Sequence, residues 1–224
     1  MDIEQVISAI GEIPFIPKER GRELYEFVRA NKPEAVLELG FAHGVSSCYI
    51  GAALKANGSG LLTTMDLDRT RPRPELANLL DISPWDPDIR TLLKTTELED
   101  WVEPVFTPTS YNWELMHLLE NTPAGQWRFD FAFIDGAHSW FVDGLAFFLV
   151  DRLLKPGGWV LFDDLDWTYG SSPSLRETGY VRAMPAEERD TPQIGKVFDL
   201  LVRPHPGYRQ FRRDSNWGWA RKGP

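Results

Sequence analysis

A chain of 224 residues is long enough for one α/β domain with a substantial core. Its net charge of −9 argues against nonspecific nucleic-acid binding, because neutralising phosphates requires a basic surface. With 42% hydrophobic residues and one cysteine, Cys48, neither disorder nor an internal disulfide is expected. Because the sequence contains no run of membrane-spanning length and no secretory signal, we expect a cytoplasmic protein that acts on a small molecule.

Residues 1–33 carry two short amphipathic helical patterns, separated by the segment around Pro14 and Pro17. Proline disfavours helix at the residue before it, and the second pattern stops before Pro33. We expect this region to form a helical cover for a domain of residues 34–224, or the contact between two copies in a homodimer.

A strand, a tight loop and a helix start follow in the segment AVLELGFAHGVSSCYIGAAL. The apolar run Ala35 to Leu39 ends at Gly40, and Gly44 opens the helix. Because glycines lack side chains, they let backbone N–H groups approach a ligand at the helix N-terminus. The spacing Gly-x-x-x-Gly lacks the three glycines of the dinucleotide fingerprint, so a purely structural turn explains it about as well. His43 lies inside this turn and either contacts a cofactor or faces solvent.

Leu61 to Asp68 predicts a second strand that ends in acidic residues. Nucleotide-binding folds place the carboxylate that accepts the ribose hydroxyls at this position, roughly twenty residues after the first turn. Asp66 is the first candidate for this role and Asp68 the second. The stretch from Arg69 to Asp100 is irregular, contains the helical pattern IRTLLK, and suggests no chemical role.

Three further strands complete the parallel part of the predicted sheet. Val102 to Phe106 is the third strand, followed by a polar exit at Thr107 to Ser110 and a helix through Leu119. Asp130 to Ile134 and Trp159 to Phe162 are the fourth and fifth strands. A helix joins the last two, and the right-handed crossover makes such a βαβ pair parallel and close.

The helix of this crossover is predicted from Trp140 to Leu154, and Lys155-Pro156-Gly157-Gly158 terminates it. Apolar side chains recur at the spacing of a face packed on a sheet. The residues of this face are Phe141, Leu145, Phe148, Leu149 and Leu153.

Carboxylates follow both strands of the crossover, Asp135 after the fourth and Asp163 and Asp164 after the fifth. Neighbouring parallel strands lie roughly 5 Å apart, so these carboxylates can converge at the edge where α/β sheets bind ligands. Converging carboxylates repel unless a cation lies between them, and oxygen ligands suit Mg²⁺. His138, three residues after Asp135, could act there as a general base. The alternative is structural, since aspartate at a strand exit often only caps a helix or starts a turn.

The chain then continues through residues 165–193, which are rich in proline, glycine, serine and charge and long enough for a lid over the site. A helix from Ile194 to Val202 follows. Tyr208 to Arg212 and Trp217 to Arg221 are predicted as two short strands with a polar turn between them.

Together, the ELGxxxG turn, the acidic second-strand exit, the LLKPGG break and the terminal strand pair resemble a class I S-adenosylmethionine-dependent methyltransferase. The resemblance covers nearly all of the chain after residue 33. It implies a doubly wound, Rossmann-like α/β fold with a mostly parallel seven-stranded sheet in the order 3-2-1-4-5-7-6, the seventh strand antiparallel, and helices on both faces.

The segments IDGAH, KPGG and FDD are similar to those of metal-dependent O-methyltransferases, such as catechol-type enzymes and the sugar-modifying enzymes of macrolide biosynthesis. Catechol-type enzymes have lysine at the place of His138 and Asp-Asn at the place of Asp163-Asp164, so the sugar-modifying enzymes match better. The resemblance implies a methionine contact, a ribose contact, an adenine contact, a metal site and a base. The methionine contacts would be Glu38, Gly40, Gly44 and Ser46, the ribose contact Asp66, and the adenine contacts Thr109 and Ser110. The metal ligands would be Asp135, Asp163 and Asp164, with Asp135 also beside the cofactor. His138 would be the base.

The expected activity is therefore transfer of a methyl group from S-adenosylmethionine to a hydroxyl of a small molecule, with Mg²⁺ or another divalent cation. Two other functions fit the same fold, since fold does not fix function. A nicotinamide-dependent oxidoreductase would explain the glycine turn but gives no role to the acidic residues. A non-catalytic binding domain would leave them without a function as well.

Overall fold

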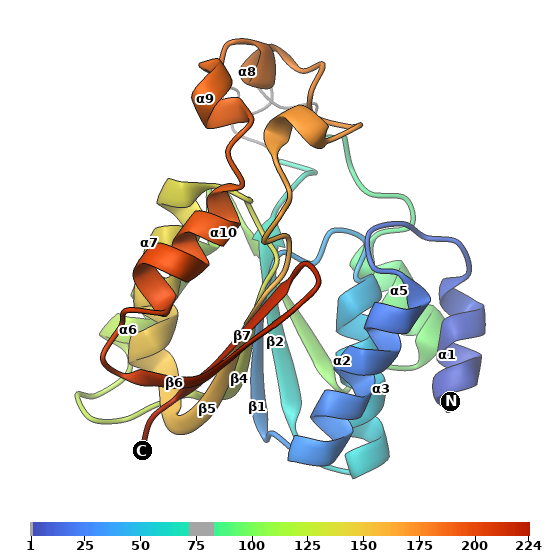
Figure 1. The fold of residues 1–224 in the computed structure, drawn as a ribbon. Helices are drawn as coiled ribbons and strands as arrows, with labels where there is room; N and C mark the ends of the chain where they lie inside the picture. The colour runs from blue at the N-terminus through green and yellow to red at the C-terminus, as the bar shows by residue number, and fades with distance from the viewer. Residues whose placement is uncertain (1, 72–82) are drawn as a thin grey trace.

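A computed structural model, which describes residues 2–71 and 83–224, contains a seven-stranded sheet in the order β3-β2-β1-β4-β5-β7-β6 (Figure 1). Strands β1 to β5 are parallel, and β7 runs antiparallel to both β5 and β6. The predicted order and strand directions are thus confirmed. The strands are β1 Ala35–Leu39, β2 Leu61–Leu67, β3 Val102–Thr107, β4 Phe129–Ile134, β5 Leu154–Phe162, β6 Tyr208–Asp214 and β7 Trp217–Lys222.

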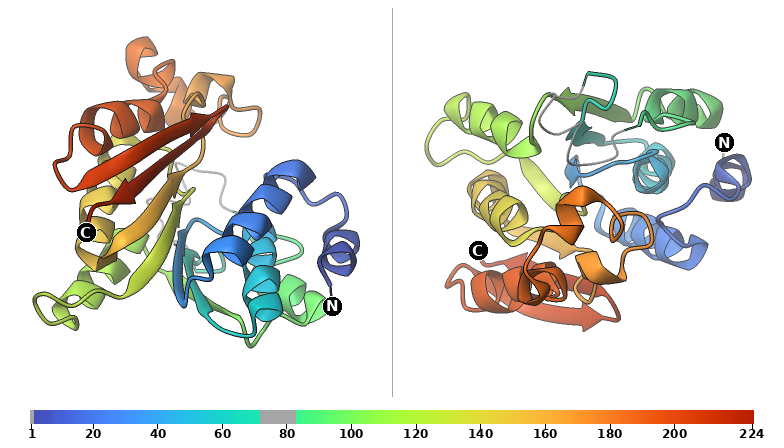
Figure 2. Two further views of the ribbon diagram at one scale, coloured as in Figure 1. Left: turned by 60° about the horizontal axis from the view of Figure 1, so that its bottom comes forward. Right: turned by 90° about the horizontal axis from the view of Figure 1, so that it is seen from above.

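Helices cover both faces of the sheet, as the doubly wound prediction requires (Figure 2). One layer contains α1 Ile3–Ile10, α2 Lys18–Asn31, α3 Val45–Asn57 and α5 Ile89–Thr96. The other contains α6 Tyr111–Glu120, α7 Trp140–Leu153 and α10 Gln193–Val197, which continues as the π-helical turn η2 Phe198–Val202. Each layer has its own hydrophobic cluster against the sheet, and Val6, Leu24 and Val28 of the N-terminal helices belong to the first.

The predicted buried face of α7 is wrong for three of its five residues. Phe141 is 61% exposed, Leu145 50% and Phe148 44%, whereas Leu149 packs against the core and Leu153 is buried. The helix is apolar around most of its circumference, so periodicity alone did not select a face. The buried stripe contains Asp143 together with Ala146, Phe147, Val150 and Leu153.

The break after α7 also differs from the prediction. The helix ends at Leu153 and β5 begins at Leu154, so the Lys-Pro-Gly-Gly segment lies inside the strand rather than before it. The pairing of β4 with β5 shifts register between Phe129 and Phe131, and Gly157 has a φ of +79°. A bulge with glycine accommodates the extra residues, which explains why this turn-like sequence is compatible with a strand.

Residues 165–193 stand beyond the carboxyl ends of the strands (Figure 1). They contain the 3₁₀ turn η1 Tyr169–Ser171 and the short helices α8 Gly179–Arg182 and α9 Ala186–Arg189. Part of the irregular stretch predicted after β2, residues 72–82, lies outside the described residues. Among the helices that the structure describes, none combines the length and apolar character needed to cross a membrane.

Candidate active site

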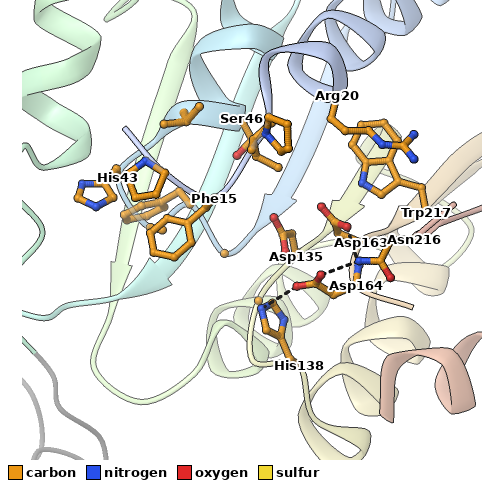
Figure 3. A pocket seen from close by; sticks show the side chains of 18 of the residues that line it. Phe15, Arg20, His43, Ser46, Asp135, His138, Asp163, Asp164, Asn216 and Trp217 are labelled. Carbon is orange, nitrogen blue, oxygen red and sulfur yellow. Dashed lines mark hydrogen bonds and ion pairs between the residues drawn. The ribbon is translucent and has the colours of Figure 1, made fainter. Parts of the chain in front are cut away.

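A cavity of about 360 Å³ opens at the carboxyl ends of β1, β4 and β5 (Figure 3). Side chains reach it from segments far apart in the sequence: the turn at residues 14–17, the glycine loop after β1, the exits of β4 and β5, and the turn between β6 and β7. Ser46, Asp66, Asp135, His138, Asp163 and Asp164 all line it, so most of the predicted site residues share one cavity.

The glycine loop is shaped by close backbone contacts. Gly40 has a φ of +90°, and a Cβ atom there would lie 2.0 Å from the carbonyl oxygen of Asp135. Gly44 has a φ of +92°, and a Cβ atom there would lie 2.6 Å from the Ile89 side chain. Both positions therefore require glycine, and Gly40 lets the exits of β1 and β4 touch.

Glu38 is a buried carboxylate at the base of this loop. Its Oε2 atom accepts hydrogen bonds from the hydroxyls of Ser47 and Thr64, the latter at 2.5 Å. Its Oε1 atom has no hydrogen-bond partner among the described residues. Burial raises the pKa of Glu38, and the nearby hydroxyls of Ser46, Ser47 and Thr64 oppose this shift. A buried acceptor without a donor is costly, so Oε1 is suited to a ligand that donates.

Asp66 holds the glycine loop as well as lining the cavity. Its Oδ2 atom accepts from the backbone N–H groups of Phe41 at 3.1 Å and Ala42 at 2.8 Å. Burial raises the pKa of Asp66, while these backbone hydrogen bonds lower it. Asp68, the second candidate, instead accepts from Thr70, and it is not among the residues that line the cavity.

Among the described residues, Asp135, His138 and Asp164 form a group that could hold a metal ion. One potential ligand atom from each residue lies within 4.8 Å of the other two. His138 Nε2 lies 3.2 Å from Asp164 Oδ2. Burial and the charges of Asp163 and Asp164 raise the pKa of Asp135 well above its usual value. Burial lowers the pKa of His138, although nearby carboxylates oppose that shift.

The hairpin of β6 and β7 holds the two carboxylates that follow β5, Asp163 and Asp164. Asn216 Nδ2 donates to Asp164 Oδ1 at 2.8 Å, and the Trp217 side chain hydrogen-bonds Asp163. Asp163 Oδ1 also accepts from the backbone N–H of Asp164 at 2.6 Å. Burial, followed by the charge of Asp164, raises the pKa of Asp163 to about 6. Asp163 thus lines the cavity but points toward the β6–β7 hairpin, and it is not part of the group formed by Asp135, His138 and Asp164.

Local sequence patterns did not predict the residues that support these carboxylates. Asn216 lies in a turn that looked only polar and Trp217 begins β7, and the antiparallel pairing of β7 with β5 brings both to the site. Arg20 of α2 is a third such residue. Its guanidinium lies 4.8 Å from the centre of the Trp217 ring and donates to the carbonyl of Asp214 at 3.0 Å.

Thr109 and Ser110 lie outside the cavity-lining residues. The Ser110 hydroxyl accepts from the N–H of Asn112 at 3.1 Å and so caps α6. His43 does line the cavity, and its ring lies 4.6 Å from that of Trp85 and 5.8 Å from that of Phe15.

The sheet order, the antiparallel β7 and the cavity beside a glycine loop define a class I methyltransferase fold. Residues 37–165, more than half of the chain, match the model of a family described as a methyltransferase domain. The chain belongs to this methyltransferase domain family. No curated protein matches the chain.

Solved structures of methyltransferases, two of them O-methyltransferases, share the fold at low sequence identity. TomG from Streptomyces achromogenes, solved with SAM, is 17% identical with a TM-score of 0.64, over 99% of this chain and 89% of that chain. An O-methyltransferase from Bacillus cereus in complex with SAH is 19% identical with a TM-score of 0.60, over 98% and 89%. SAH-bound PaMTH1 from Podospora anserina is 16% identical with a TM-score of 0.62, over 99% and 87%.

Proposed function

We propose that this protein transfers a methyl group from S-adenosylmethionine to a hydroxyl of a small molecule, with the help of Mg²⁺ or another divalent cation. The acceptor would be a sugar or natural-product hydroxyl, a phenol or a catechol. The observation that carries the proposal is the convergence of Asp135, His138 and Asp164 in the same cavity as the glycine loop. The SAM- and SAH-bound O-methyltransferases with this fold support it.

The residues around the glycine loop fit S-adenosylmethionine, which supplies a methyl group activated on a sulfonium. The partnerless Oε1 of Glu38 suits the methionine ammonium. Gly40 and Ser46 line the cavity, whereas Gly44, which opens α3, and Glu38 lie outside the lining residues. Asp66 would accept the ribose hydroxyls. Thr109 and Ser110 would lie toward the adenine. The backbone of Asp135, which lies against Gly40, would bound the cofactor on its other side.

The carboxylates fit a divalent cation. Asp135, Asp163 and Asp164 are hard oxygen donors of the kind Mg²⁺ prefers. Burial raises the pKa of all three, and the charges of neighbouring carboxylates add to the shift for Asp135 and Asp163, a repulsion that a cation would relieve. Such a cation lowers the pKa of a hydroxyl bound to it. Asn216 would keep Asp164 oriented toward it, while Trp217 holds Asp163 beside the site.

His138 is the proposed general base. Its lowered pKa keeps the imidazole neutral at pH 7, the form that accepts a proton from the acceptor hydroxyl. The cavity would align that oxygen with the methyl group, and alignment alone can remove roughly 7 to 11 kcal/mol of a barrier. A positioned base adds about 10²- to 10⁴-fold.

An assay of methyl transfer from labelled S-adenosylmethionine to a panel of sugar, phenol and catechol acceptors would test the proposal. We expect activity with Mg²⁺ and its loss in excess chelator. In Asp163→Asn, raised Mg²⁺ should partly restore activity, because the change weakens a ligand without removing the site. Asp166→Asn is the matched control, since Asp166 is exposed and paired with Arg213. Full activity in excess chelator would reject the metal.

The same assay distinguishes whether His138 acts as a base or as a metal ligand. His138→Ala should keep cofactor and metal affinity but slow transfer by about 10²-fold or more. Raised pH should partly restore the rate, because the acceptor hydroxyl then ionises without a base. An unaltered pH profile in this variant, or a loss of metal affinity as large as that of Asp163→Asn, would contradict the assignment as base.

A further inference from the structure

A buried tyrosine and a buried aspartate lie directly behind the loop that carries His138. Tyr111, the first residue of α6, is 5% exposed, and Asp143, in the first turns of α7, is fully buried. The Tyr111 hydroxyl donates to Asp143 Oδ1. Neither residue is among those that line the cavity, and the proposed chemistry gives neither a role.

Both side chains hold the backbone on either side of His138. The Tyr111 hydroxyl accepts from the N–H of Ala137 at 3.1 Å, and Asp143 Oδ2 accepts from the N–H of Ser139 at 2.9 Å. The Tyr111 ring also lies against Gly136, where a Cβ atom would come within 2.5 Å of it. The pair therefore fixes three positions around the imidazole, two before His138, at residues 136 and 137, and one after it, at residue 139.

The conformation of His138 requires such support. Its φ is +56°, and that of its partner Asp164 is +59°, both in the left-handed region that residues with a Cβ atom disfavour. Strained backbone of this kind persists only where the surroundings impose it. Hydrogen bonds to the N–H groups immediately before and after His138 are a direct means of imposing it.

Capping of α7 does not account for Asp143. The Ser139 hydroxyl already caps the helix by accepting from the N–H of Val142 at 3.3 Å. A buried carboxylate is costly unless it is hydrogen-bonded, and an apolar residue would fill this position without that cost. Burial raises the pKa of Asp143, as expected for a group enclosed on all sides.

We infer that Tyr111 and Asp143 are positioning residues, whose mutual hydrogen bond holds the loop of residues 135–139 so that the His138 imidazole faces Asp164. The inference rests on the proposed function of His138 and the carboxylates. Residues beyond β5 reach the same loop, since the Tyr169 hydroxyl donates to the Ala137 carbonyl at 3.0 Å. The loop is thus held from α6, from α7 and from the segment after β5.

The test compares Tyr111→Phe with Tyr208→Phe. Tyr208 is also buried, and its hydroxyl faces Asp151 near the opposite end of α7. Tyr111→Phe should lower kcat through His138, and Mn²⁺ affinity through Asp135 in the same loop, by about 10- to 100-fold, as the loss of such supporting groups typically does, with unchanged SAH affinity. Tyr208→Phe should change none of the three, even if it costs similar stability.

Histidine-labelled NMR provides a readout that needs no acceptor. The chain has four histidines, and the His138 ring signal can be assigned by its loss in His138→Gln. Tyr111→Phe should shift or broaden it, whereas Tyr208→Phe should move only the signal of His205, whose ring lies 5.4 Å from that of Tyr208. If Tyr111→Phe does not fold, Asp143→Asn should give the same displacement.

The outcomes separate the two proposals. If the wild type binds no Mn²⁺ and transfers no methyl group, the proposed function fails. If the wild type binds Mn²⁺, and Tyr111→Phe and Asp143→Asn leave both the His138 signal and the Mn²⁺ affinity unchanged, the positioning role is overturned while the proposed function stands.

Discussion

At the scale of single residues, Asp66 is a carboxylate that holds the protein's own backbone at the place proposed for a ligand contact. The backbone N–H groups of Phe41 and Ala42 occupy its Oδ2 atom, and the N–H of Leu67 donates to Oδ1 at 2.6 Å. These bonds fix the glycine loop relative to β2. The spacing in the sequence predicted a ligand contact at this position, and only the structure added the contact with the loop.

We expect Asp66→Ala to weaken binding of S-adenosylmethionine. Loss of hydrogen bonds to a charged group costs about 1.5 to 3 kcal/mol, or about ten- to a hundred-fold in Kd. Isothermal calorimetry would measure it, with Asp68→Ala as a control that removes the same charge from a residue bonded to Thr70. Equal affinities in the two variants would mean that the wrong carboxylate, or the wrong cofactor, has been assigned.

At the scale of elements, α7 shows the limit of reading a helix by periodicity. Its exposed stripe at Phe141, Leu145 and Phe148 and its buried stripe at Asp143, Phe147 and Val150 have the same spacing. The second stripe packs on the sheet because the first turn also carries Asp143, whose partners Tyr111 and the Ser139 N–H lie inside. Of the two apolar faces, the one that also carries a buried, hydrogen-bonded carboxylate is thus the one that packs on the sheet.

Two phenylalanine substitutions on this helix should therefore differ sharply. Phe147→Ala should lower the free energy of unfolding by about 3 to 5 kcal/mol, because Phe147 is fully buried. Phe141→Ala should change it by about 0.5 kcal/mol or less, because the side chain is mostly exposed. Urea unfolding of both variants would check this, and a large loss in Phe141→Ala would place that side chain in an interface.

At the scale of the whole molecule, the sheet collects negative charge at one edge. Asp135, Asp163 and Asp164 come from two strand exits. Burial raises the pKa of each, and the charges of neighbouring carboxylates add to this shift for Asp135 and Asp163. A carboxyl group whose pKa is raised on folding stabilises the protein at low pH, and this contribution is lost as pH rises through the folded-state pKa. For Asp163 this stabilising contribution is lost between pH 3.8 and about pH 6.

Without divalent cations, Asp163→Asn should therefore raise the melting temperature relative to wild type at pH 7.5 but not at pH 4. The comparison cancels the opposite contribution of His138, whose lowered pKa destabilises the fold on acidification. Mg²⁺ should raise the melting temperature of the wild type at pH 7.5, less at pH 4, and less in the variant. Thermal unfolding with and without chelator measures all three. A Mg²⁺ effect of equal size at both pH values would contradict a carboxylate site.

Much of the site followed from the sequence, because strand exits in a parallel sheet meet at one edge. Asp135, Asp163 and Asp164 could be placed there without coordinates, and His138 with them. Their supports could not be predicted in this way. Arg20, Tyr111 and Asn216 lie far along the chain from the residues they contact, and no local pattern marks a side chain for a distant partner.

The sequence by itself determined the strands and the parallel crossovers between them, since alternating strands and helices with right-handed crossovers leave few topologies. The order of the strands and the antiparallel seventh strand followed from the resemblance to class I methyltransferases that its motifs carry. The sequence also determined which exits carry acid. The tertiary structure alone decided which face of α7 is buried, that the Lys-Pro-Gly-Gly segment lies within β5, and that the β6–β7 turn orients the carboxylates. The physical reason is that these features depend on packing and hydrogen bonds between segments distant in sequence, whereas local periodicity reports only what each segment can form by itself.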